Sequence, residues 1–127
     1  MKSRLYKKLL ALALVVVVSP SLFAADNASA TKTIAGVLVN LNHFPSDGEK
    51  AELAALSEDD GVGRAFRAIA NAVANMQHAV SADDKDIMNR IIASERAHAN
   101  AKLFAEILLD LNHTANDETK VRLQELM

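Results

Sequence analysis

One feature constrains this sequence more than any other: a stretch of about two dozen residues occurs three times, and each copy begins 35 residues after the one before. The copies align without a gap over residues 34–56, 69–91 and 104–126. Self-similarity at a fixed period of this length is typical of repeat proteins, in which neighbouring units bury faces that no single unit can cover. We therefore expect one domain over residues 25–127, built from three repeats. The repeats are expected to span 25–59, 60–94 and 95–127.

Three repeat positions carry the same residue in every copy. They hold an alanine, a histidine and a lysine: Ala35, Ala70 and Ala105; His43, His78 and His113; Lys50, Lys85 and Lys120. Three of the four histidines in the chain therefore occupy one repeat position. Small alanines at equivalent positions predict close approach between helices, whereas the histidines need a separate explanation.

Apolar residues in the first half of each repeat follow the i, i+3, i+4, i+7 spacing of an amphipathic helix. In the first copy these residues are Ile34, Val37, Leu38 and Leu41. A polar break follows, and a residue suited to cap the N-terminus of a second helix comes next in each copy: Ser46, Ser81 and Asn116. The pattern predicts an αα-hairpin in each repeat and an all-α fold of about six helices. Because residues 95–101 contain no Gly or Pro, two helices are expected to run together there.

The first 24 residues have the composition of a secretory signal peptide. Four basic residues precede an apolar run from Leu9 to Val18, and small residues lead to Ala24. This run is shorter than the about 20 residues that a membrane-spanning helix needs. We therefore expect residues 1–24 to be a signal peptide, the protein to be periplasmic or secreted, and no membrane span to remain after cleavage.

Composition narrows the possible functions of the remaining chain. Without residues 1–24 it has ten basic and sixteen acidic residues, a formal charge of −6, which disfavours binding to nucleic acid. The absence of cysteine excludes a disulfide framework and a thiolate nucleophile. The sequence also lacks G-x-S-x-G, H-E-x-x-H and glycine-rich phosphate-binding motifs. We therefore expect a protein that is not an enzyme and that has no resident cofactor.

The repeated histidines have two interpretations. In the structural one, each ring lies at the C-terminal end of a helix and satisfies its unpaired carbonyl groups. In the functional one, His43, His78 and His113 together bind a transition metal such as zinc or copper. Packed helices lie about 8 to 10 Å apart, whereas zinc–nitrogen bonds measure about 2.0 to 2.1 Å. An open stack of repeats would keep the rings apart, and a closed arrangement would bring them together. We favour the structural interpretation, which convergence of the three rings would overturn.

Helical-repeat proteins commonly present an extended surface to a partner. By this analogy the sequence predicts a non-catalytic interaction module that binds a protein or peptide. Two alternatives remain: a small metal-binding protein that uses the repeated histidines, and a pH-responsive stress protein in which the same histidines gain charge together and stabilise the fold.

Overall fold

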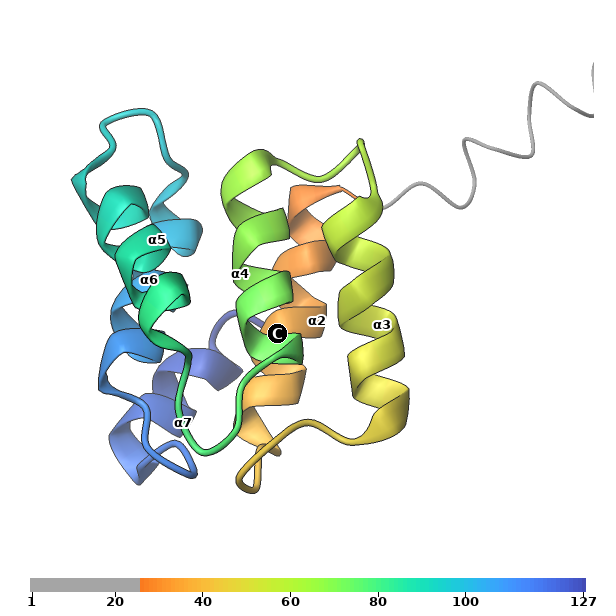
Figure 1. Cartoon of the computed structure of the whole chain (residues 1–127), viewed down its shortest axis with the longest axis vertical. Coiled ribbons are helices and arrows are strands. Elements are labelled where there is room, and N and C mark those ends of the chain that lie inside the picture. Colours follow the sequence, from red (N-terminus) through yellow and green to blue (C-terminus); the bar gives the residue numbers. More distant parts are fainter. Residues whose placement is uncertain (1–25) are drawn as a thin grey trace, which may run out of the picture.

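The computed structural model describes residues 26–127 (Figure 1). This part of the chain contains six α-helices and no strand: α2 (Asn27–Val39), α3 (Asp47–Glu58), α4 (Arg64–Ala74), α5 (Ala82–Ala93), α6 (Ala99–Asp110) and α7 (Asp117–Gln124). The predicted all-α class is confirmed, and the domain is a small helical bundle. None of these helices combines the length and the apolar character needed to cross a membrane. The predicted signal peptide, residues 1–24, lies outside the described residues.

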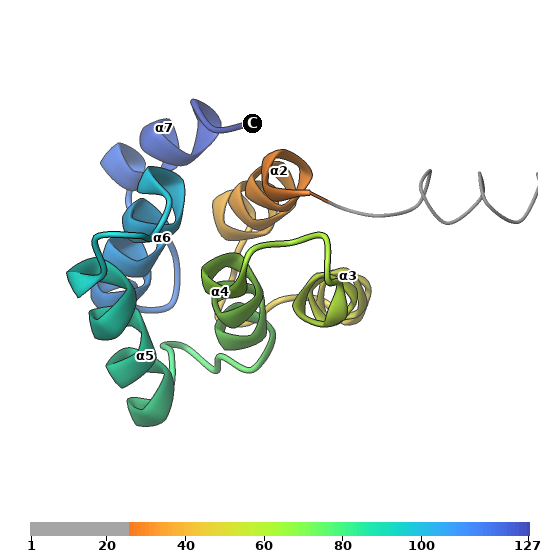
Figure 2. The same cartoon turned by 90° about the horizontal axis from the view of Figure 1, so that it is seen from above.

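The helices pack as a closed ring. The most extensive contacts pair α3 with α4, α5 with α6 and α7 with α2. In each pair, the second helix of one 35-residue segment packs on the first helix of another, and α7 near the C-terminus returns to α2. Figure 2 shows α3, α5 and α7 arranged around α2, α4 and α6. The two helices of a single segment contact each other less. The hairpin predicted from the sequence is therefore not the main packing unit.

The core is formed largely by the apolar stripes of α2, α4 and α6. Leu38, Val73 and Leu108 are 35 residues apart and have no exposed surface. Ala35, Ala70 and Ala105 are equally buried, as the repeat pattern predicts. Fully burying a Val or Leu side chain contributes about 1.5 to 3 kcal/mol, so these stripes hold the three first helices together and thereby fix the positions of their C-terminal ends.

The predicted N-caps of α3, α5 and α7 are confirmed. A side-chain oxygen of Ser46, Ser81 or Asn116 accepts a hydrogen bond from the backbone N–H three residues later, at 3.2, 3.2 and 2.8 Å respectively. Each cap satisfies a donor that the helix itself leaves unpaired. The caps fix where the second helix begins and so set the length of the segment that contains each repeated histidine.

The expectation that two helices run together over residues 95–101 is wrong. Helix α5 ends at Ala93 and α6 begins at Ala99. Ser94 Oγ accepts a hydrogen bond from the Arg96 N–H at 3.3 Å, and His98 Nδ1 accepts one from the Asn100 N–H at 3.1 Å. These side-chain acceptors offer the backbone an alternative to continued helix, so the chain turns there without Gly or Pro.

Candidate metal centre

The segments that follow α2, α4 and α6 meet at one end of the bundle, where the repeated histidines bond to one another through their backbones. The His43 N–H donates to the carbonyl of His113 at 2.9 Å, the His78 N–H to that of His43 at 2.8 Å, and the His113 N–H to that of His78 at 2.6 Å. Each histidine is both donor and acceptor, so the three form a closed ring of hydrogen bonds. This ring fixes the three Cα atoms relative to one another.

All three histidines have a backbone conformation that side chains normally avoid. Their φ angles are 69°, 69° and 70°, and they are the only non-glycine residues with positive φ among residues 26–127. This left-handed region costs a residue with a Cβ about 1 to 2 kcal/mol, and glycine is its usual occupant. The Phe44 N–H also donates to the Asn42 carbonyl at 2.8 Å across His43, which closes a γ-turn. Three equivalent residues with positive φ, none of them glycine, mark this end of the bundle as one where the surrounding structure holds the backbone in an uncommon conformation.

The three imidazole rings converge. Their centroids are 5.0 Å apart for His43 and His78, 5.1 Å for His43 and His113, and 4.7 Å for His78 and His113. One ring nitrogen of each lies within 4.8 Å of the other two. The expectation that the rings lie beyond the reach of a shared metal is therefore wrong. The reason is the closed packing of the helices, which replaces the open stack on which that expectation depended.

The spacing of the nitrogens is close to what a metal ion requires. Tetrahedral zinc with Zn–N bonds of about 2.0 to 2.1 Å separates its nitrogen ligands by about 3.3 Å. Starting from 4.8 Å, each nitrogen would move inward by less than about 1 Å, a shift available to side-chain rotation. His78 and His113 are exposed and His43 is half-buried, so solvent reaches the cluster. Three histidines with one side open to water match the ligand set of zinc sites that keep a fourth position for water or another ligand.

Hydrogen bonding prepares at least one ring for ligation. His113 Nδ1 lies 2.7 Å from Asn112 Oδ1. Because the amide oxygen can only accept, Nδ1 carries the hydrogen of the neutral ring and Nε2 presents its lone pair. In known metal sites, a hydrogen bond from the second ring nitrogen fixes both the tautomer and the orientation of the ligand. Asn112 therefore has the position of a residue that orients a metal ligand.

His43 presents a ring nitrogen that lacks a partner. Its Nδ1 is buried and makes no hydrogen bond among the described residues. Leaving a buried polar atom unpaired costs about 1 to 3 kcal/mol. Ligation of a cation is one way to satisfy such a ring nitrogen.

The predicted capping role of the histidines is not what the structure contains. Helix α2 ends at Val39, four residues before His43. The carbonyl of Gly36 accepts from the backbone N–H of Asn40 at 3.3 Å and from its side-chain Nδ2 at 3.1 Å. Asn75 stands at the equivalent C-cap of α4, where its backbone N–H donates to helix carbonyls, whereas Asp110 is the last residue of α6 and its carboxylate cannot donate such a bond. With the helix end satisfied by Asn40, the imidazole is free for another role.

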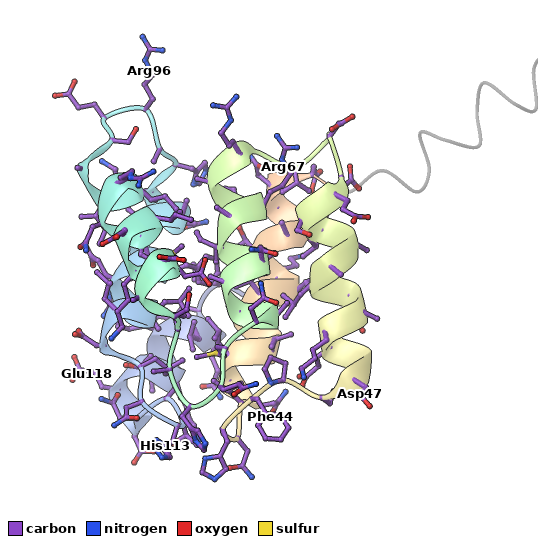
Figure 3. All side chains as sticks on the ribbon, in the orientation of Figure 1. Phe44, Asp47, Arg67, Arg96, His113 and Glu118 are labelled. Atoms are coloured by element: carbon purple, nitrogen blue, oxygen red, sulfur yellow. The ribbon has the colours of Figure 1, made fainter. Side chains whose placement is uncertain are left out.

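The fourth histidine is not part of this cluster. His98 caps α6, and its ring packs against that of Phe66 at a centroid distance of 5.6 Å. Figure 3 labels its near neighbour in sequence Arg96 at one end of the molecule and His113 at the other. His98 therefore offers an internal control for experiments on the three clustered histidines.

Comparison of this chain with family models, with curated proteins and with solved structures gives no match. The assignment of the site therefore rests on the geometry of His43, His78 and His113.

Proposed function

We propose that this chain is a small metal-binding protein that takes one transition-metal ion, zinc(II) or copper(II), with His43, His78 and His113 as ligands. The observation that carries the proposal is the convergence of three imidazole nitrogens within 4.8 Å on a closed backbone ring. Imidazole is a good ligand for both metals. The positive φ of all three histidines adds support, because strained residues cluster at sites where a particular side chain is needed.

Export is part of this proposal. The signal-peptide composition of residues 1–24 supports it, and an exported protein without cysteine relies on imidazole and carboxylate groups to hold transition metals. The role we propose is metal binding outside the cytoplasm. The protein or peptide interaction predicted from the repeat architecture stays a prediction.

The clustering of the rings bears on the pH-responsive alternative. Protonation would stabilise the fold if each ring capped a separate helix. With ring centroids 4.7 to 5.1 Å apart, three protonated imidazoles would repel one another at short range. For the metal-loaded protein we expect the opposite effect of acid, because protons compete with the metal for the ring nitrogens and release the ion.

The proposal is tested by titrating the purified protein with zinc or copper(II) in competition with a chromogenic chelator. We expect one ion per chain, and an affinity at least about 100-fold lower in the triple variant His43→Asn, His78→Asn, His113→Asn. Asparagine is the replacement because it tolerates positive φ, so the backbone ring is retained. Circular dichroism checks that the variant is folded.

The matched control is His98→Asn, which removes an imidazole at the opposite end of the bundle and leaves a residue able to cap α6. This variant should bind the metal as the unaltered protein does. Equal affinity in the triple variant and the unaltered protein would contradict the proposal. So would an equal loss in the His98 variant.

A further inference from the structure

A groove lies between α4 and α5, at the end of the bundle remote from the clustered histidines. Its volume is about 690 Å³, and its floor is apolar, lined by Ile87, Ala65, Ala68 and Ala97 together with the more deeply buried Phe66 and Ile91. Small-molecule sites have volumes of about 300 to 1,000 Å³ and are mostly apolar, with a few charged or polar groups that orient the ligand. The groove has both the size and the floor of such a site.

The rim of the groove is basic. Arg64, Arg90 and Arg96 line it, and no acidic residue does. All three are exposed, and none forms an ion pair within residues 26–127. This concentration of charge contrasts with the rest of the described chain, in which acidic residues outnumber basic ones by sixteen to seven. The groove therefore attracts an anion to a surface that is otherwise predominantly acidic.

The apolar floor and the basic rim specify different parts of one ligand. Burying a hydrocarbon chain against this apolar floor would be favourable at about 25 cal/mol per Å² of surface removed from water. A guanidinium group forms paired hydrogen bonds with a carboxylate, a geometry that arginine provides and lysine does not. An inorganic anion would leave the floor in water, and a cationic or neutral amphiphile would leave the arginines without a partner.

We propose that this groove binds a single-chain amphiphile with a carboxylate head group, that is, a fatty acid. The hydrocarbon chain lies along the floor between α4 and α5, and the head group lies at the arginine rim. His98, which also lines the groove, accepts at Nδ1 from the Asn100 N–H, so the neutral ring carries its hydrogen on Nε2 and adds a donor near the rim. This site is separate from the proposed metal centre and shares no residue with it.

The test is a titration of the purified protein with laurate below its micelle-forming concentration, followed by calorimetry. We expect saturable binding of about one laurate per chain and no comparable binding of dodecyltrimethylammonium, which has the same hydrocarbon chain with the opposite charge. In the triple variant Arg64→Gln, Arg90→Gln, Arg96→Gln, laurate affinity should fall at least about tenfold. Because all three arginines are exposed, the fold should be retained, which circular dichroism checks.

Arg122→Gln is the matched control, because Arg122 is an exposed arginine outside the groove. It should leave laurate affinity unchanged. The proposal is overturned if laurate does not bind saturably, if the cationic amphiphile binds as well as laurate, or if the arginine triple variant binds laurate normally. The proposal is also overturned if the protein sediments with anionic phospholipid vesicles but does not bind laurate. The groove would then recognise a membrane surface and not a single fatty acid.

Discussion

The two ends of this bundle differ in how the chain is held. At the histidine end, three segments have the same backbone conformation and bond to one another in a ring. At the end that carries the groove arginines, the connections differ from one another. Asp59 Oδ1 accepts from the Gly61 N–H in one turn, Ser94 and His98 accept backbone hydrogen bonds in another, and Asp26 caps α2. Threefold regularity is thus kept where the segments depend on one another. A site that needs three equivalent metal ligands can therefore form at the histidine end. At the other end, where the connections differ, a single asymmetric groove can form.

The largest expected effect is stabilisation of the histidine end by metal. A ligand present at about 100 times its Kd raises the free energy of unfolding by about 2.7 kcal/mol, which corresponds to a Tm increase of several degrees in a domain of this size. A thermal melt with and without zinc checks this. The increase should persist in His98→Asn and disappear in His78→Asn. An equal increase in both variants would show that the two ends do not differ in metal binding.

Loss of an orienting residue should have the next largest effect. Asn112→Ala removes the acceptor that fixes the tautomer of His113, and such changes typically weaken metal affinity about 10- to 100-fold. The competition titration measures the change. Asn89→Ala, at an exposed position of α5 away from the cluster, should leave the affinity unchanged. If both variants bind metal equally well, Asn112 does not orient the ligand.

The positive φ of the histidines predicts a smaller effect that can be seen without metal. His78→Gly should be more stable than His78→Ala by about 1 kcal/mol, because glycine adopts this conformation freely and alanine does not. At the adjacent position 79, alanine should be more stable than glycine. Ala79 does not have positive φ, and Ala79→Gly adds chain entropy to the unfolded state. Urea unfolding of the three variants measures both differences. Greater stability of His78→Ala would contradict the strain inferred for the backbone ring.

The smallest expected effect concerns acid stability at the arginine end. Hydrogen bonds from the backbone N–H and the hydroxyl of Ser29 hold the pKa of the Asp26 carboxyl below its ordinary value of 3.8. A lowered pKa in the folded state contributes stability above pH 3.8, and this contribution is lost as the pH falls through the folded-state pKa. In Asp26→Asn, the free energy of unfolding should therefore fall less steeply as the pH drops below 3.8. Metal release at higher pH should be unchanged. Unfolding curves at a series of pH values measure this difference. An equally steep fall of the free energy of unfolding in both proteins would contradict the role inferred for Asp26.

Much of the fold follows from local sequence signals. The apolar spacing around Leu38 and the caps at Ser46, Ser81 and Asn116 predict the helices, because both depend on residues within a turn or two of each other. The break at residues 94–98 leaves no Gly or Pro signal in the sequence, because side-chain acceptors take the place of these residues there. These local signals show where each helix begins and ends, but they do not show which helices pack together.

The candidate site also depends on a tertiary contact that local sequence signals do not predict. The identical position of His43, His78 and His113 is visible in the sequence, but their convergence depends on α7 packing on α2, a contact between the two ends of the described chain. A repeat pattern predicts contacts between neighbouring units and leaves closure undetermined. The positive φ of a histidine is likewise set by the backbone ring that closure creates. The three histidines of the candidate site can thus be named from the sequence, and only the closed fold reveals their arrangement.

The most direct test of the metal centre is X-ray absorption spectroscopy of the zinc-loaded protein. The account predicts a first shell that includes three imidazole nitrogens at about 2.0 to 2.1 Å, with the multiple scattering that histidine rings produce, and one further oxygen or nitrogen ligand. The same spectrum should lose its imidazole features in the variant with asparagine at positions 43, 78 and 113. A first shell of oxygen alone in the unaltered protein, or an unchanged spectrum in that variant, would contradict the assignment of these histidines as metal ligands.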